Sequence, residues 1–428
     1  MSWAAVSHLL PWLAATLAAL GVVQAVAGDL AIRRFAAHAR AQPRMPGQWR
    51  PPVTVLKPLH GDEPMLLQAL ASFCAQDYPA WQIVFGVAHP SDAACAAVAR
   101  LRADFPHLDI ALVVNPAQHG HNRKVSNLIN MLPAARHDLL VIADSDLHVA
   151  PDYLDRVVAA LARPGVGLVT TLYVGWAAAE RLAERLGASQ ITYTFLPGAL
   201  LGRALGRQDC LGVTMALRRE TLARVGGLPA LVDHVADDAV LGRLVRALGL
   251  TVELGATMPA ATVADATLRA GFRHELRWAR TIRLLGPAAF ASSSLQYPLA
   301  WAGLAIALSG GAAWALALFA GAWAARAAVA RSIDRTLAPL IEPCAHARAL
   351  CAPFWLLPLR EAMSAGVMVM SYRTRRVHWR GHALRVSRPP RLAKPRRAGW
   401  ASTPRAAPRP PAAPPGGSAR KPAAPSPG

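Results

Sequence analysis

The first long apolar stretch of the chain runs from Leu9 to Ala27 and carries no charged residue. About 20 apolar residues in a helix are enough to cross the hydrocarbon core of a bilayer. No lysine or arginine precedes the stretch, whereas Arg33 and Arg34 follow it. A cleaved signal peptide carries its positive charge in front, although Ala25-Val26-Ala27 resembles a cleavage site. The pattern therefore predicts an uncleaved transmembrane anchor over residues 1–28, with the chain after it in the cytoplasm.

Between residues 51 and 286, short aliphatic runs alternate with stretches that have the apolar spacing of helices. Expected strands lie at Val53–Leu56, Ile83–Val87, Ile110–Val114, Leu139–Ala143 and Val166–Thr171. Expected helices between them lie at Pro64–Ala75, Asp92–Asp104, Val125–Leu132 and Pro151–Leu161. This alternation predicts an α/β fold, with a mostly parallel sheet covered by helices on both faces. Such sheets bind ligands at the carboxyl ends of their strands, so we expect the chemistry there.

Apolar residues return in the last third of the chain. Leu295–Ala330 is long enough for two crossings that turn at Ser309-Gly310-Gly311, or for one crossing with an interfacial remainder. Cys351–Met370 is a second candidate, but Arg360-Glu361 at its centre would be costly in lipid. Both arrangements stay open. Together these segments predict C-terminal membrane or interfacial helices over residues 295–371.

Charge changes this picture mainly at the C-terminus. The net charge of +21 would suggest nucleic-acid binding, but the residues from Arg373 onward supply +14 of it and contain no Asp or Glu. A basic tail beside apolar helices fits anionic lipid headgroups better, so we expect a lipid bilayer and no nucleic acid as partner. Twelve prolines from Pro389 onward predict a disordered, basic tail over residues 389–428. The five cysteines have no paired spacing, which favours a reducing compartment and argues against a zinc site.

Two carboxylates directly follow the expected strand Leu139–Ala143, in the sequence Asp144-Ser145-Asp146. Carboxylates at a strand end can hold Mg²⁺ or Mn²⁺ and leave the ion open to diphosphate oxygens. A plain turn, which Asp and Ser favour by hydrogen bonds to the backbone, is the alternative interpretation. The position after a buried strand, with Pro151 opening the next helix, favours the metal site.

A second acidic pair, Asp237-Asp238, opens the expected helix Ala239–Leu248. Carboxylates at a helix start are stabilised by the helix dipole, so capping alone can explain the pair. A carboxylate in such a position is also suited to take a proton from an attacking hydroxyl, as a general base does.

A third signal is a basic helix between residues 272 and 280. Arg273, Arg277 and Arg280 fall on one side of it, at positions i, i+4 and i+7. They could form a cationic face for a pyrophosphate. The alternative is an amphipathic helix whose basic side rests on lipid headgroups, and the two interpretations are compatible.

The order and spacing of these three signals resemble the metal-dependent GT-A glycosyltransferases, and in particular the ceramide glucosyltransferase family. The family's motif Lys-Pro-Leu-x-Gly is matched by Lys57-Pro58-Leu59-His60-Gly61. Its motif Asn-x-Lys-x-x-Asn-Leu resembles Asn122-Arg123-Lys124-Val125-Ser126-Asn127-Leu128. Its acceptor-side segment resembles Leu211-Gly212 to Arg219, followed by Gly226-Gly227-Leu228. The resemblance extends from Pro52 to Leu285. It implies a GT-A nucleotide-sugar-binding fold over residues 51–286.

The resemblance also implies roles for the matching residues. Asp238 would be the general base, and Asp144 and Asp146 would hold the metal ion. The donor would be bound by Lys57, Pro58, Asp92, Lys124, Asp144, Arg277 and Trp278. Two positions depart from the family pattern: His274 stands where Gln or Arg opens the Arg-Trp motif, and the position of Asp146 is variable in ceramide enzymes.

The resemblance implies an inverting transfer of a sugar, N-acetylglucosamine or glucose, from a UDP-sugar to a hydroxyl of a membrane lipid. An amino-acid composition rich in Ala and Arg indicates a bacterium, and ceramide is uncommon in bacteria. Among members of the family, this favours a resemblance to the hopanoid biosynthesis-associated glycosyltransferase, which acts on bacteriohopanetetrol. The expected location is the bacterial inner membrane, with several crossings and a cytosolic catalytic domain. A bacterial ceramide or glycolipid glucosyltransferase, a processive polysaccharide synthase and a non-catalytic membrane scaffold are the alternatives. A processive synthase would carry Gln where His274 stands.

Overall fold

The computed structural model describes residues 3–42, 50–341, 354–374, 376–379 and 382–385. The tail predicted over residues 389–428 lies outside these ranges, as do Cys344 and Cys351. Residues 51–286, for which the α/β fold is predicted, are described without a gap.

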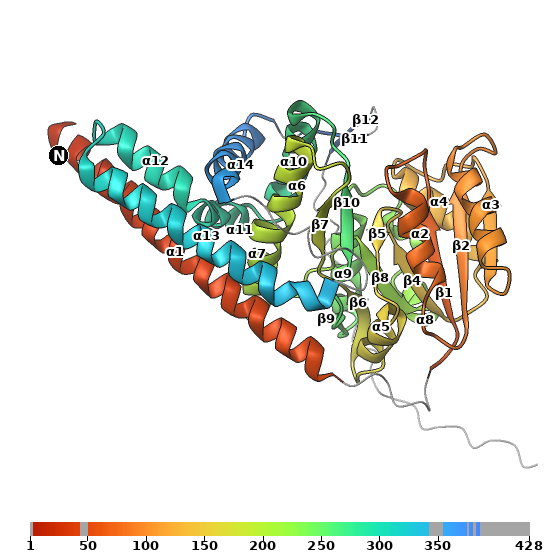
Figure 1. Ribbon diagram of the computed structural model, residues 1–428. Helices are drawn as coiled ribbons and strands as arrows, with labels where there is room; N and C mark the ends of the chain where they lie inside the picture. Colours follow the sequence, from red (N-terminus) through yellow and green to blue (C-terminus); the bar gives the residue numbers. More distant parts are fainter. Residues whose placement is uncertain (1–2, 43–49, 342–353, 375, 380–381, 386–428) are drawn as a thin grey trace, which may run out of the picture. The chain divides into compact units, whose positions relative to one another are not determined.

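A seven-stranded sheet forms the centre of the α/β part, in the order β3-β2-β1-β4-β8-β6-β9 (Figure 1). Its strands are β1 (Val53–Pro58), β2 (Trp81–Val87), β3 (Asp109–Val114), β4 (Leu139–Ala143), β6 (Val166–Thr170), β8 (Thr214–Arg218) and β9 (Thr251–Leu254). All neighbouring strands run parallel except β8, which lies antiparallel to both β4 and β6. The five expected strands and the mostly parallel sheet are thus confirmed, while the sequence pattern does not predict β8 and β9.

Helices cover both faces of this sheet because its strands alternate apolar side chains between two cores. The helices are α2 (Leu66–Cys74), α3 (Ala94–Asp104) and α5 (Tyr153–Leu161) on one face, and α4 (Arg123–Met131), α8 (Arg219–Arg224) and α9 (Asp237–Ala247) on the other. Leu139 and Val141 of β4 lie in the first core, and Leu140 and Ile142 lie in the second. This period of two is typical of a strand that is buried on both faces.

A smaller sheet adjoins residues 144–146, which we call the Asp-x-Asp turn. It contains β5 (Leu147–His148), β10 (Ala260–Val263) and β7 (Val174–Ala177), in the order β5-β10-β7, and is followed by α6 (Leu182–Gln190), the π-helical turn η2 (Ile191–Phe195) and α7 (Leu196–Ala204). The amide of Thr262 in β10 donates to the carbonyl oxygen of Asp146 at 3.0 Å. A Cβ at Gly175 in β7 would lie 2.5 Å from the Cα of Ala188 in α6, so only glycine permits this contact. Backbone packing therefore fixes α6 relative to the Asp-x-Asp turn.

Three apolar helices lie side by side: α1 (Trp3–Ala41), α12 (Pro298–Leu308) and α13 (Ala313–Ile341) (Figure 1). Among the described residues, α1 from His8 onward and α13 are long and apolar enough to cross a membrane. They run parallel, because Trp12 stacks on Trp314 at 4.4 Å while the Ser332 hydroxyl donates to Asp29 at 2.6 Å further along both helices. The 11 residues of α12 amount to about 16 Å of helix, roughly half of a hydrocarbon core.

The remaining described elements follow or join the α/β part. They are η1 (Leu132–Ala134), η3 (Leu228–Leu231), α10 (Leu268–Leu285), α11 (Pro287–Ser292), η4 (Ser293–Gln296), η6 (Phe354–Leu356), α14 (Leu357–Ser371), β11 (Arg376–Trp379) and β12 (His382–Arg385). α14 corresponds to the second membrane candidate of the sequence, and its 15 residues are fewer than a crossing needs. Arg360 and Glu361 in this helix are each only 1% exposed. Both have an ion-pair partner on another helix, which offsets the cost of burying them.

Candidate active site

Lys124, in the first turn of α4, connects the two acidic signals of the sequence. Its ammonium group pairs with the carboxylate of Asp144 at the end of β4 and lies 3.4 Å from the carbonyl oxygen of Gly212. Gly212 in turn lies against Asp238, since a Cβ there would be 3.2 Å from Asp238 Oδ2. Burial lowers the pKa of Lys124, but Asp144 and Asp237 outweigh it and raise the pKa above its usual value. The Asp-x-Asp turn and the start of α9 therefore meet around one lysine.

Asp238 lies at the start of α9, where its carboxylate accepts a hydrogen bond from the amide of Ala239 at 2.7 Å. Burial and the neighbouring charge of Asp237 raise the pKa of Asp238 to about 7. Asp237 accepts a hydrogen bond from Asn122 at 3.3 Å, and its Oδ2 is buried without a partner among the described residues. A carboxylate with a pKa near 7 is suited to take up a proton at neutral pH, so Asp238 has the chemistry of a general base.

Asp146, the last residue of the Asp-x-Asp turn, lies near Glu63, a carboxylate that the sequence pattern does not single out. Burial, then the charges of Asp144 and Glu63, raise the pKa of Asp146 to about 7. Glu63, in the loop after β1, accepts a hydrogen bond from the Ser145 hydroxyl at 2.6 Å. We call Glu63, Asp144, Asp146, Asp237 and Asp238 the carboxylate cluster.

Lys57 is hydrogen-bonded to the backbone of the Asp-x-Asp turn. Its side chain is fully buried, and its ammonium group donates to the carbonyl oxygen of Asp144 at 2.7 Å and lies 3.5 Å from the ring centre of Phe73. Burial lowers the pKa of Lys57 to about 7. Lys57 thus holds the backbone at the end of β4, and Pro58 after it ends β1. A direct contact of Lys57 or Pro58 with the donor stays a prediction.

Asp92 joins the loops that follow β1 and β2. Its Oδ1 accepts the amide hydrogens of Gly61 at 2.9 Å and of Ala94 at 3.0 Å. His60 lies 3.6 Å from the other carboxylate oxygen. These bonds shape the same edge of the sheet as the carboxylate cluster, as expected for strand ends of a parallel sheet. A contact of Asp92 with a nucleotide stays a prediction.

Arg277 and Trp278 lie on α10, next to the smaller sheet. The Trp278 ring packs against a small apolar cluster that contains Ile191 and Val263 of β10. His274 lies edge-on to this ring, with 4.5 Å between the ring centres, and bonds to Asp265 at 3.0 Å. Val263 of this cluster follows Thr262 in β10, and the amide of Thr262 bonds to the Asp-x-Asp turn. The roles of Arg277 and Trp278 at a diphosphate stay predictions.

The carboxylate cluster has the chemistry to hold a divalent cation. Five carboxylates outnumber the two lysines near them, the buried Lys57 and the half-buried Lys124, and oxygen ligands suit Mg²⁺ and Mn²⁺. The Asp144 side chain is 33% exposed, so it can be reached from solvent. Among the described residues, no group of three or more His, Cys, Asp or Glu side chains is arranged to hold a metal ion. Asp144 and Asp146 would therefore hold a cation together with oxygens of a ligand.

The sequence profile of glycosyl transferase family 21 matches residues 13–392. The chain belongs to this family. The predicted resemblance to the ceramide glucosyltransferase family and the GT-A α/β fold that it implies are thereby confirmed, in agreement with the sheet described above.

Several ceramide glucosyltransferases are relatives of this family 21 chain. Ceramide glucosyltransferase 1 of Caenorhabditis elegans is 24% identical over 262 residues, which are 60% of this chain and 54% of the relative. Ceramide glucosyltransferase of Komagataella phaffii is 34% identical over 115 residues, which are 26% of this chain and 23% of the relative. The chain thus spans about half the length of the first relative and about a quarter of the second.

Two solved structures are similar to the family 21 chain at lower sequence identity than these relatives. A mannosyltransferase from Pyrobaculum calidifontis, in complex with GDP-Man and Mn²⁺, is 22% identical with a TM-score of 0.45, over 83% of this chain and 99% of that one. Glucosyl-3-phosphoglycerate synthase from Mycobacterium tuberculosis, in complex with Mn²⁺ and UDP, is 16% identical with a TM-score of 0.34, over 52% and 77% of the two chains.

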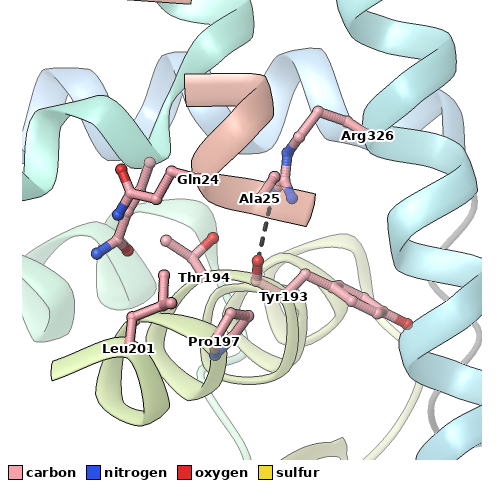
Figure 2. A pocket seen from close by; sticks show the side chains of 9 residues that line it. Gln24, Ala25, Tyr193, Thr194, Pro197, Leu201 and Arg326 are labelled. Carbon is pink, nitrogen blue, oxygen red and sulfur yellow. Dashed lines mark hydrogen bonds between the residues drawn. The ribbon is translucent and has the colours of Figure 1, made fainter. Parts of the chain in front are cut away.

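A small pocket of this family 21 chain lies apart from the carboxylate cluster, among α1, η2, α7 and α13 (Figure 2). Tyr193, Pro197 and Leu201 line it together with Gln24 and Arg326. None of its lining residues belongs to the predicted donor site.

Proposed function

We propose that this family 21 protein is an inverting glycosyltransferase that moves a sugar from a nucleotide-sugar to a hydroxyl of a membrane lipid. One observation carries the proposal: Asp144 and Asp238, which are 94 positions apart in sequence, meet around Lys124 at the carboxyl ends of the strands. The ceramide glucosyltransferases among the relatives support a lipid acceptor.

The proposed step needs a base for the acceptor hydroxyl. Asp238 takes the hydroxyl proton while the oxygen attacks the anomeric carbon of the sugar from the face opposite the diphosphate. As the new carbon–oxygen bond forms, the bond to the diphosphate breaks, and its electron pair leaves with the nucleoside diphosphate. The raised pKa of Asp238 makes its carboxylate a stronger base than an exposed aspartate.

The diphosphate needs positive charge as it leaves. We propose that Asp144 and Asp146 hold Mg²⁺ or Mn²⁺, which would neutralise the charge on the leaving phosphates. Lys124 already pairs with Asp144, so it is near enough to add a second positive charge. Arg277 and Trp278 are proposed to cover the same group from α10.

The nucleotide, the sugar and the acceptor lipid are proposed from the sequence. We propose UDP as the nucleotide, with N-acetylglucosamine or glucose as the sugar, and a hopanoid such as bacteriohopanetetrol as the acceptor. The names of the relatives favour the alternative acceptor, ceramide. Lipid analysis of a deletion strain tests the proposal. We expect loss of one glycosylated lipid and accumulation of its free acceptor, whereas an unchanged lipid profile would contradict it.

We also propose that the protein lies in a bacterial inner membrane, with the α/β part in the cytoplasm. Two features support this: the arginines after the first apolar stretch, and the parallel course of α1 and α13. If α1 leads into the cytoplasm, a parallel α13 does so too, and the basic tail follows it there.

Reporter fusions test this topology. Fusions at Arg50 and after Gly381 are expected to give cytoplasmic signals, and a fusion at the N-terminus a periplasmic one. The turn at Ser309–Ala312, between α12 and α13, offers an internal control, because a tag there should be reached only from the N-terminal side. A periplasmic signal from Arg50 would contradict the proposed orientation.

A further inference from the structure

Arg360 of α14 forms a buried, two-pronged ion pair with Glu275 of α10. Its two terminal nitrogens each donate to one carboxylate oxygen of Glu275, both at 2.7 Å. Arg360 is 1% exposed and Glu275 is 8% exposed. Two parallel charge-assisted hydrogen bonds fix the distance between the groups and also their mutual orientation. The pair therefore sets how α10 is rotated against α14.

The same guanidinium reaches a third helix, α6. It donates to the carbonyl oxygen of Leu186 at 3.1 Å and to the hydroxyl of Ser364, which itself donates to Gln190 at 3.0 Å. Leu186 and Gln190 both belong to α6, which Gly175 fixes against the smaller sheet. Arg360 thus connects α10 to α6, the helix that packs against the smaller sheet. That sheet bonds to the Asp-x-Asp turn through Thr262.

Glu361, the next residue of α14, forms a second buried ion pair in another direction. Its carboxylate accepts a hydrogen bond from Arg326 of α13 at 2.7 Å and one from the amide of Leu299 in α12 at 2.7 Å. Arg326 also donates to the carbonyl oxygen of Tyr193 at 3.3 Å (Figure 2). This pair connects α14 to the apolar helices, so it is a matched comparison for the pair on α10.

Glu275 is close in sequence to the two residues proposed to cover the diphosphate. At 3.6 residues per turn, Arg277 lies about 200° around the helix from Glu275, and Trp278 lies about 60° from it. An anchor on the Glu275 side therefore turns Arg277 away from α14. Trp278 packs against the apolar cluster of Ala188, Ile191 and Val263, and Val263 follows Thr262, the residue whose amide bonds to Asp146.

We propose that Arg360 and Glu275 are positioning residues for the transfer reaction: their ion pair fixes the rotation of α10 and so holds Arg277 and Trp278 over the donor diphosphate. This inference rests on the proposed function. It gives α14 the role of a support for the donor site, and it gives Arg360, a charge in a mostly apolar helix, a reason to be there.

A double replacement separates positioning from folding. Glu275→Leu with Arg360→Met removes both charges at once, and replacing a buried pair by apolar residues of similar volume is often neutral for stability. We expect the thermal unfolding midpoint in detergent to stay within a few degrees of wild type. The affinity for UDP, measured by calorimetry, should fall about tenfold, while the affinity for uridine, which has no phosphates, stays unchanged. Arg360→Lys keeps the charge but loses the fork, so it should show a smaller loss of UDP affinity.

Two comparisons make the test specific. Arg326→Met with Glu361→Gln removes the second pair but keeps an acceptor for the Leu299 amide, and it should leave UDP affinity unchanged. In an Arg277→Ala background, the double replacement at 275 and 360 should have little further effect, because both changes act on the same contact. Unchanged UDP affinity in the 275/360 variant, an equal loss in both pairs, or full additivity with Arg277→Ala would overturn the inference. If the wild-type protein itself fails to bind UDP, the proposed function fails instead.

Discussion

The Asp238→Asn variant is expected to transfer sugar about 10²–10⁴-fold more slowly than the wild-type protein. Asparagine keeps the size and polarity of the side chain but cannot take up the acceptor proton. Binding of UDP should survive, because Asp238 meets the acceptor hydroxyl in the proposed step and not the nucleotide. Turnover of a radiolabelled UDP-sugar in detergent, together with calorimetry of UDP, measures the two effects separately. Near-normal turnover in this variant would remove Asp238 from the role of base.

The pH profile provides an independent check on the same residue. A base must be unprotonated to act, and the pKa of Asp238 is raised to about 7. We therefore expect kcat/KM to fall as the pH drops below about 7 and to level off above it. Asp237 contributes to this raised pKa through its charge. The Asp237→Asn variant should shift the acid limb to lower pH and keep much of its activity, unlike Asp238→Asn.

The second large effect concerns the metal ion. In the Asp144→Ala variant, the affinity for UDP is expected to fall about 10²-fold and to lose its dependence on Mg²⁺ or Mn²⁺. Asp146→Ala should be milder, because its position varies in the ceramide family and burial already raises its pKa to about 7. Titration of UDP with and without a chelator is the direct measurement.

The alternative interpretation of the Asp-x-Asp turn makes a different prediction. If the two aspartates only shape a turn, both alanine variants should lose similar, small amounts of stability, and UDP binding should ignore the chelator. Uridine is the control ligand, since it lacks the phosphates that would contact the ion. Chelator-insensitive binding of UDP by the wild-type protein would contradict the metal site.

The sequence was informative where the structure is locally determined. Strands such as Leu139–Ala143 are runs of aliphatic residues between two cores, and this pattern is visible without any contact information. Strands such as β7 and β10 contain Gly, Ala and Thr, and their strand state depends on pairing with each other and with β5. A short strand of this kind has no local signal of its own.

The candidate site divides in the same way. The sequence singled out Asp144, Asp146 and Asp238 because each follows a strand or opens a helix. Glu63 stands in a loop, and only the fold brings it next to Ser145, 82 positions away. The complete burial of Lys57 could not be predicted from the sequence either, because its ammonium group bonds to a backbone carbonyl of the Asp-x-Asp turn.

The parallel pairing of α1 with α13 has a consequence for biogenesis. The hydrogen bond between Ser332 and Asp29 joins residues 303 positions apart, and a ribosome that adds 5–20 residues per second needs about 15–60 s to make that length of chain. During this time α1 is complete while the residues that later bury Ala14, Ala18 and Ile32 are still being made. The α/β part must therefore fold while its anchor is only partly packed, and a chain that stops before α13 would expose that apolar face to lipid or to insertion chaperones.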